Sequence, residues 1–158
     1  MKIFRVQTPS VPMLAACLIA LTALLVPAAA SASERSGKLR VTKECSEYTG
    51  LAGSFCTITA SNLPAIPVGS KVFYDQGAGV PAGMLDSNVV LDAGNGNRAV
   101  GRCTLDGATN LGLCTFSDGT GELRGFHARV NVSLDSAGLP NYRWRGTYRF
   151  AETGEGND

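Results

Sequence analysis

Histidine is almost absent from this sequence, which contains only His127. The Gly-x-Ser-x-Gly segment that forms the nucleophile elbow of many hydrolases is also missing. The cysteine spacings match no zinc-binding pattern, and a single histidine leaves few nitrogen ligands for a metal ion. The sequence therefore identifies no catalytic residue, no metal site and no cofactor.

An excess of charge of either sign is lacking as well. The chain has 14 lysines and arginines against 13 aspartates and glutamates. Without the N-terminal segment 1–32, which is described below, twelve basic and thirteen acidic residues remain, and the net charge is −1. Bulk charge therefore gives no reason to expect nucleic acid or an anionic membrane as a partner.

The only long hydrophobic run lies near the N-terminus. Lys2 and Arg5 precede an apolar run at residues 13–26, and small residues follow at positions 28–32. This layout is typical of a secretory signal peptide, and the run is short for a membrane span. We predict cleavage after Ala32, with Ala30 as the alternative, and disfavour a lipoprotein because Cys17 lies early in the run. Residues 33–158 then form one domain that is secreted or periplasmic and has no membrane contact after cleavage.

Four cysteines remain after the signal peptide: Cys45, Cys56, Cys103 and Cys114. An even number of cysteines in an exported chain indicates disulfide bonds, and four cysteines allow three pairings. If residues 106–110 form a hairpin loop, Cys103 lies opposite Cys114, and the first pair is arranged similarly around Gly50. This register favours the pairing Cys45–Cys56 and Cys103–Cys114, with each bond worth about 3 kcal/mol. A metal site is the alternative reading of the same residues.

An alternation of apolar and polar residues dominates the C-terminal third. In residues 124–134 and 142–150 the even positions are mostly apolar, and the odd positions are mostly polar or basic. A period of two places successive side chains on opposite faces of a sheet. The aromatic residues should therefore face a core, and His127, Arg129, Arg143, Arg145 and Arg149 should face outward. A solvated outer face is the simplest reading of these arginines, and a docking surface for an acidic partner is the alternative.

Six shorter segments have the composition of strands: residues 39–45, 54–60, 71–74, 87–92, 98–105 and 111–116. In the first of them Lys43 interrupts the apolar series. Asn95–Gly96 and Asp118–Gly119 are predicted hairpin turns, because such pairs tolerate positive φ angles. With the two C-terminal strands the total is eight, the number that closes a small barrel around side chains or one small ligand. We therefore predict an all-β, eight-stranded antiparallel barrel, with a two-sheet sandwich as the alternative.

Residues 114–128 (CTFSDGTGELRGFHA) resemble the Gly-Gly-Thr-Gly motif and following strand of the allene oxide cyclase and dirigent proteins. The similarity extends to residues 69–75 and 146–148, so this chain resembles a secreted bacterial member of that group. The resemblance implies an eight-stranded barrel and often a homotrimer. The cyclases use a carboxylate in the first strand, an asparagine two residues later, and then a Ser-Pro pair. Here Glu44 is the nearest acid, Ser46 stands two positions on, and no Ser-Pro pair follows.

The functional hypothesis combines the barrel with its inward aromatic residues. Aromatic walls and tyrosine hydroxyls suit a small hydrophobic or aromatic ligand, and the resemblance implies that such a ligand is guided through cyclisation or coupling without covalent catalysis. The candidate ligand-binding residues are Tyr74, Asp75, Phe126, Tyr142, Trp144 and Tyr148. Core packing is the competing reading of the aromatic residues. The alternative functions are a non-catalytic interaction module that acts through its outer face as an oligomer, and an enzyme inhibitor that presents its loops.

Overall fold

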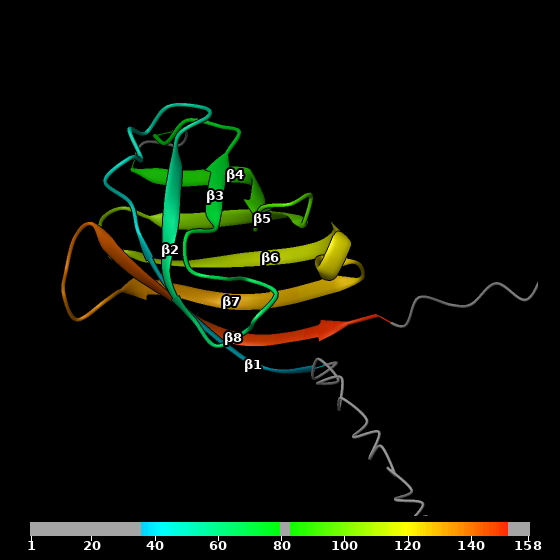
Figure 1. Cartoon of the computed structure of the whole chain (residues 1–158). Helices are drawn as coiled ribbons and strands as arrows, with labels where there is room; N and C mark the ends of the chain where they lie inside the picture. The colour runs from blue at the N-terminus through cyan, green and yellow to red at the C-terminus, as the bar shows by residue number, and fades with distance from the viewer. Residues whose placement is uncertain (1–35, 80–82, 152–158) are drawn as a thin grey trace, which may run out of the picture. The chain divides into compact units, whose positions relative to one another are not determined.

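The chain forms a closed antiparallel β-barrel of eight strands, seen in a computed structural model that describes residues 36–79 and 83–151 (Figure 1). The predicted barrel is thereby confirmed, and the two-sheet sandwich is excluded. The predicted signal peptide, residues 1–32, lies outside the described residues. The strands are β1 (Ser36–Glu44), β2 (Phe55–Ser61), β3 (Lys71–Tyr74), β4 (Met84–Asp92), β5 (Arg98–Asp106), β6 (Leu111–Thr120), β7 (Phe126–Leu134) and β8 (Asn141–Phe150).

Pairing between the first and last strands closes the barrel. Every strand pairs with its sequence neighbour, and β1 also pairs with β8 from Ser36 opposite Arg149 to Glu44 opposite Asn141. The connections therefore alternate between the two ends. One end, here called the cysteine end, carries the β1–β2, β3–β4, β5–β6 and β7–β8 loops. The other, here called the terminal end, carries the remaining loops together with Ser36 and Phe150.

The β6–β7 connection differs from its prediction. Asp118 and Gly119 do not form a turn, because β6 continues to Thr120 and pairs with the start of β5. A register shift between Val100 and Gly101 allows the longer strand to stay in the ladder. The turn is made instead by a short 3-10 helix, Gly121–Leu123. The predicted turn at Asn95–Gly96 is confirmed, with φ angles of 53° and 79°.

The two disulfide bonds pair as predicted and lie at the cysteine end. Cys45 is joined to Cys56 across the β1–β2 hairpin, and Cys103 is joined to Cys114 across β5 and β6. Cys103 and Cys114 are direct partners in the ladder, as the hairpin argument required. Cys56, Cys103 and Cys114 are buried inside the barrel, so the disulfides form part of its inner wall.

The terminal half of the barrel is filled by side chains. Trp144 and Phe126 are fully buried, as the alternation predicted. Phe116 lies between them, with ring centroids 5.5 Å from Trp144 and 6.1 Å from Phe126. Other buried residues add to this core from the strands and from the connections at the terminal end: Leu39, Val41, Leu63, Ile66, Leu123 and Tyr148. A close-packed interior of this kind leaves no room for a ligand.

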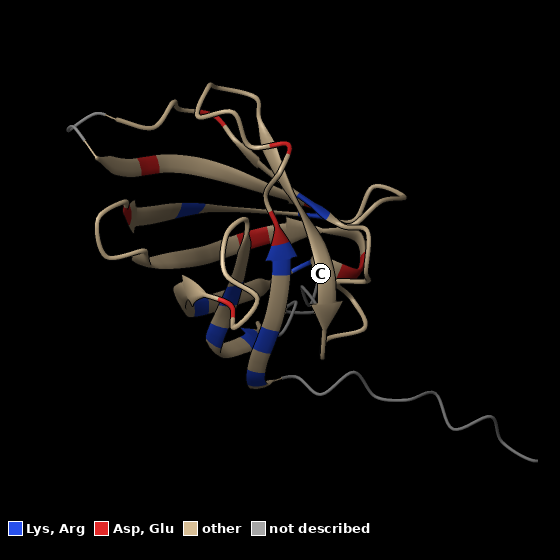
Figure 2. Cartoon of the chain, turned by 90° about the vertical axis from the view of Figure 1, so that its left-hand side faces the viewer, with Lys and Arg blue, Asp and Glu red and all other residues tan. Residues whose placement is uncertain are grey.

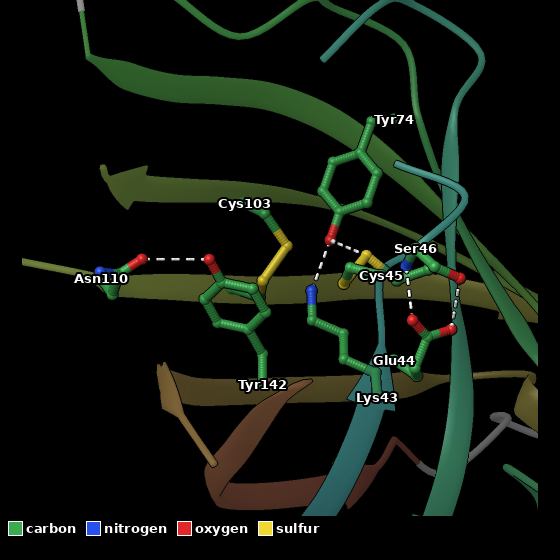
Figure 3. The surroundings of a disulfide bond; sticks show 10 residues. Lys43, Glu44, Cys45, Ser46, Tyr74, Cys103, Asn110 and Tyr142 are labelled. Carbon is green, nitrogen blue, oxygen red and sulfur yellow. Dashed lines mark hydrogen bonds between the residues drawn. A yellow bond between two sulfur atoms is a disulfide. The ribbon is translucent and has the colours of Figure 1, made fainter. Parts of the chain in front are cut away.

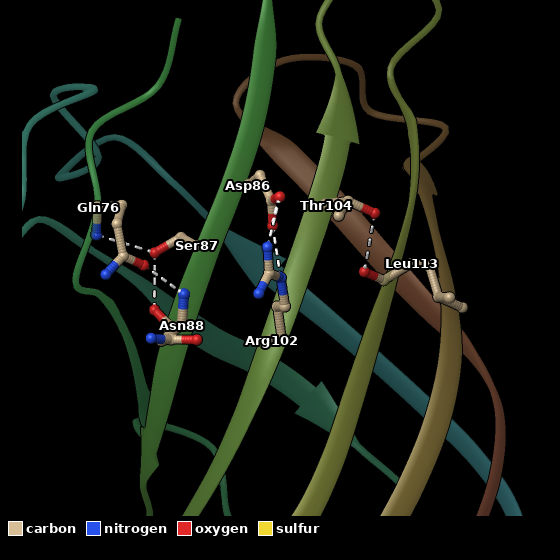
Figure 4. A network of polar contacts seen from close by, with 7 residues as sticks. All are labelled: Gln76, Asp86, Ser87, Asn88, Arg102, Thr104 and Leu113. Carbon is tan, nitrogen blue, oxygen red and sulfur yellow. Dashed lines mark hydrogen bonds and ion pairs between the residues drawn. The ribbon is translucent and has the colours of Figure 1, made fainter. Parts of the chain in front are cut away.

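The outer wall has two kinds of charged surface. On β4 and β5 the charges are paired, with Arg102 bonded to Asp86 (Figure 4) and Arg98 bonded to Asp92. On β7, β8 and β1 basic residues lie on neighbouring strands (Figure 2). Within the described residues none of them forms an ion pair. This surface, here called the basic face, consists of Lys38, Arg40, Arg129, Arg143, Arg145 and Arg149.

Candidate functional site

A buried lysine lies at the centre of the cysteine end. The inward positions of β1 are Leu39, Val41 and Lys43, and Lys43 is only 4% exposed. Its neighbour Glu44 points to the other side of the strand, where its carboxylate accepts hydrogen bonds from the Ser46 amide and hydroxyl at 2.6 and 2.9 Å (Figure 3). The same alternation that places apolar residues inside therefore carries a lysine into the interior.

The Lys43 ammonium group is surrounded by aromatic residues. Its Nζ donates a hydrogen bond to the Tyr74 hydroxyl at 2.5 Å, and the two side chains point toward each other from β1 and β3 (Figure 3). Nζ also lies 5.0 Å from the ring centroid of Trp144, 5.2 Å from that of Tyr74 and 5.9 Å from that of Tyr142. No carboxylate within the described residues forms an ion pair with Lys43. The amine is thus held by one hydroxyl and by ring faces alone.

Burial changes the proton affinity of these groups. Desolvation lowers the pKa of Lys43 to about 7, because the charged amine loses its hydration inside the barrel. The pKa of Tyr74 is raised, mainly by burial and further by the neighbouring Tyr48 and Tyr142 hydroxyls. At neutral pH the pair therefore consists of a neutral phenol and an amine that is close to half deprotonated.

A cavity of about 60 Å³ opens beside the amine, with room for about four water molecules. It is partly open to the outside at the cysteine end. Its polar lining comes from Lys43, Tyr48, Tyr74, Thr104 and Tyr142, and both disulfides contribute to its wall. Leu85, Leu105 and Val132 complete the lining as apolar surface.

Two further tyrosines present hydroxyls at this end. The Tyr142 hydroxyl donates to Asn110 Oδ1 at 3.1 Å (Figure 3). The Tyr48 ring packs edge-on against Tyr74 with centroids 5.0 Å apart, and its buried hydroxyl has no hydrogen-bond partner within the described residues. A buried polar atom without a partner is unusual in native proteins. A water or ligand atom in the cavity is the natural partner for it.

The candidate ligand-binding residues fall into three places. Tyr74 and Tyr142 line the cavity. Trp144 is not part of the lining, but its ring lies next to the Lys43 amine. Phe126 and Tyr148 belong to the packed aromatic core of the terminal half. Asp75 is exposed and lines an open depression on the outer wall together with Asn88 and Arg102. The barrel therefore brings only the two tyrosines of this set together at one cavity.

Lys43 is the site residue that the sequence interpretation did not select. Its signal was present, because Lys43 continues the spacing of Leu39 and Val41 and precedes Cys45 by two positions. Periodicity alone makes a lysine in that series an interruption of the apolar pattern. It marks instead a polar group that the strand delivers to the interior.

The chemical repertoire of the cavity is narrow. Within residues 36–79 and 83–151 no cluster of three histidine, cysteine or acidic side chains could hold a metal ion. The four cysteines are joined in disulfides. What remains is an amine, three phenolic hydroxyls, the Thr104 hydroxyl and apolar walls, a set that can donate hydrogen bonds to a ligand oxygen and can offer a nucleophilic nitrogen.

Comparison with known proteins gives no family. No protein-family model, no curated protein and no solved structure matches this chain. The resemblance to allene oxide cyclase and dirigent barrels therefore stays a prediction. Among the described residues no helix is long and apolar enough to cross a membrane.

Proposed function

We propose that the protein binds a small, mostly apolar molecule that carries one polar oxygen, and that it does so at the cysteine end of the barrel. The observation that supports this most directly is the buried Lys43 amine, which has no acidic partner within the described residues and faces a cavity. A buried amine without a counter-charge is costly for folding. A site that keeps such a group is a candidate for function rather than for stability.

The size of the cavity limits the ligand. Pockets for drug-sized molecules measure about 300–1,000 Å³, whereas this cavity measures about 60 Å³. The ligand is therefore either a molecule of a few heavy atoms or the end of a longer one whose remainder lies at the open rim. Its polar oxygen would accept from Lys43 or from the Tyr48 hydroxyl, which no described residue satisfies, and its apolar part would contact Leu85, Leu105 and Val132.

Export of the protein and guidance of a reaction belong to the same proposal. Two disulfides persist in oxidising compartments such as the periplasm or the cell exterior, which agrees with the predicted signal peptide. The resemblance adds that the barrel bends its ligand toward cyclisation or coupling without a covalent intermediate. In that case the reacting atoms would have to lie next to Lys43 and Tyr74, since the terminal half is filled.

Native mass spectrometry of the protein isolated from its own host tests the binding proposal. We expect a retained small molecule on the natural chain and its loss in Val132→Phe, which fills the cavity. Val100→Phe is the matched control, because Val100 is 48% exposed on the outer wall. Absence of any bound molecule, together with unchanged thermal stability upon addition of small alcohols and carboxylates, would contradict the proposal.

The basic face supports a second candidate function, an interaction module. Arg40 lies directly opposite Arg145 in the β1–β8 ladder, and like charges in that position destabilise a sheet. A surface that keeps such a pair suits an acidic partner, or a neighbouring copy in a ring such as the trimer that the resemblance implies. Light scattering on the natural chain and on Arg145→Glu tests this. A monomer in both cases, with no binding of acidic proteins that depends on salt, would leave the candidate without support.

A further inference from the structure

We infer that Lys43 forms a reversible imine with small aldehydes that enter the cavity at the cysteine end. The inference rests on the proposed function, since it assumes that the cavity admits a ligand. It adds a substrate class, a carbonyl compound, and a covalent step. Its starting point is geometric: an amine, a phenol and an empty space adjoin one another inside the barrel.

The amine meets the first requirement of a nucleophile, a free electron pair. Ordinary lysine side chains have a pKa of about 10.4 and are neutral in roughly one molecule in 2,500 at pH 7. Burial without a carboxylate partner brings the Lys43 pKa to about 7, so that close to half of the molecules carry a neutral amine at that pH. Lysines desolvated in apolar pockets are the ones that proteins use for Schiff-base chemistry.

Tyr74 meets the second requirement, a proton donor next to the reacting nitrogen. Its hydroxyl lies 2.5 Å from Nζ, and its raised pKa keeps it protonated. Neutral nitrogen attacks the carbonyl carbon, Tyr74 gives its proton to the carbonyl oxygen and takes one back from nitrogen, and a carbinolamine results. The hydroxyl then takes up a second proton and leaves as water while nitrogen gives up its last hydrogen and forms the C=N bond, so the adduct has the mass of protein plus aldehyde minus one water. The step needs no oxidant or reductant.

The walls of the cavity decide which aldehydes fit. The space of about 60 Å³ admits a chain of a few heavy atoms, and its apolar lining favours an alkyl group over a polar one. The rings facing Nζ are those of Tyr74, Tyr142 and Trp144, and no described carboxylate offsets the positive charge of a protonated imine. Those ring faces attract a cation and so favour the iminium form as well as the ammonium form.

Propanal with cyanoborohydride as the trapping reductant is the probe. The full-length exported protein is treated at pH 7, digested and mapped by mass spectrometry, which separates Lys43 from Lys38, Lys71 and the N-terminal amine. We expect Lys43 to be propylated at least tenfold faster than the exposed Lys38 and Lys71. Its rate should rise up to about pH 7 and then level off, while the rates of the exposed lysines continue to rise. Labelling of Lys43 at or below the rate of Lys71 would overturn the inference.

Three variants complete the test. Lys43→Arg keeps a positive charge and should remove the adduct, and Lys71→Arg should leave labelling of Lys43 unchanged. Tyr74→Phe keeps the amine and should slow propylation at least tenfold, in line with the loss of a positioned acid; an unchanged rate would contradict the role given to Tyr74. Binding of propanol, followed by thermal shift, separates the two proposals. Propanol binding without a Lys43 adduct overturns only the imine, and failure of both overturns the pocket as well.

Discussion

The two ends of this barrel are built by the same alternation of side chains, yet they have opposite properties. At the terminal end the inward positions of neighbouring strands carry rings and branched aliphatic chains, which fill the interior. At the cysteine end the inward positions carry Lys43, Tyr74, Tyr142 and the disulfides, which surround a cavity. One end contributes stability through packing. The other keeps a polar group in a place where packing alone would exclude it.

This difference shows that the alternation along a strand determines which face of the sheet a side chain occupies, but not which chemical group is placed there. β1 delivers Leu39 to a dry core and Lys43 to a pocket, four residues apart on the same face. On β8, Trp144 is buried in the core and Tyr142, two residues earlier on the same face, lines the cavity. The four predictions that follow test whether the two ends really differ in this way, in order of decreasing expected effect.

Removing the largest ring from the packed half should have the greatest effect. Trp144→Ala deletes a fully buried side chain whose ring packs against that of Phe116 with centroids 5.5 Å apart. Large-to-small changes of this kind lower the free energy of unfolding by about 3–5 kcal/mol, which urea denaturation measures. Leu139→Ala, at a site 66% exposed, serves as control and should change it by less than about 0.5 kcal/mol. A loss below about 1 kcal/mol for Trp144→Ala would mean that the terminal half is not tightly packed.

Raising the pH should increase the free energy of unfolding, because deprotonation of Lys43 removes the cost of burying a charged amine at the cysteine end. The folded-state pKa of Lys43 is lowered to about 7, so between pH 7 and about 10 the unfolded chain holds more protons than the folded one. The free energy of unfolding should therefore rise with pH across this window, by on the order of 3–4 kcal/mol in total. Above pH 10 the raised pKa of Tyr74 acts in the opposite direction, because the unfolded tyrosine ionises first.

Urea denaturation at pH 7, 8 and 9 measures this slope. Lys43→Met should abolish it and should be more stable than the natural chain at pH 7. Lys71→Met removes an exposed lysine and should leave the slope unchanged. A slope that persists in Lys43→Met would assign it to another group.

Loss of one disulfide should weaken the cysteine end selectively. Changing Cys103 and Cys114 to alanine together opens a loop with a sequence separation of 11, at a cost of about 3 kcal/mol in the chain-entropy description. Hydrogen exchange should speed up for amides of β5 and β6 near the cysteines, while amides near Phe126 stay protected. Equal loss of protection at both ends would show that the barrel responds as one unit.

The smallest effect should come from the tyrosine hydroxyls. Tyr48→Phe removes a buried hydroxyl that has no partner within the described residues, so it should leave the free energy of unfolding unchanged or raise it by up to about 1 kcal/mol. Tyr142→Phe removes a hydroxyl that donates to Asn110 and should lower it by about 1 kcal/mol. Thermal denaturation of Tyr48→Phe and of Tyr142→Phe measures whether each change stabilises or destabilises the protein. A destabilising Tyr48→Phe would indicate a water or ligand bound to that hydroxyl.

Local patterns predicted much of the fold. The period of two identified the two C-terminal strands, composition and turn residues identified the other six, and a hairpin loop at residues 106–110 placed Cys103 opposite Cys114. The predicted turn at Asp118–Gly119 was wrong because both residues stay in the ladder with the start of β5, beyond a register shift that leaves Ser117 as an extra residue in β6. A local turn rule takes no account of pairing with another strand.

The pocket was harder to predict for a related reason. The environment of Lys43 is made by Tyr74, Tyr142 and Trp144, which belong to β3 and β8 and are distant in the sequence. Periodicity shows that a side chain points inward, but it does not show which groups meet there. The aromatic residues proposed from the pattern were therefore a mixture of pocket wall and core.

The closing ladder between β1 and β8 has a consequence for how this protein comes into being. Chains are made from the N-terminus onward, so β1 waits with an unpaired edge until the last strand has been synthesised. Lys43 on β1 and Tyr142 on β8 are ladder partners, which means that the pocket exists only in the finished chain. A truncated product lacking β8 would have two open sheet edges, which are prone to aggregation, and would have no site.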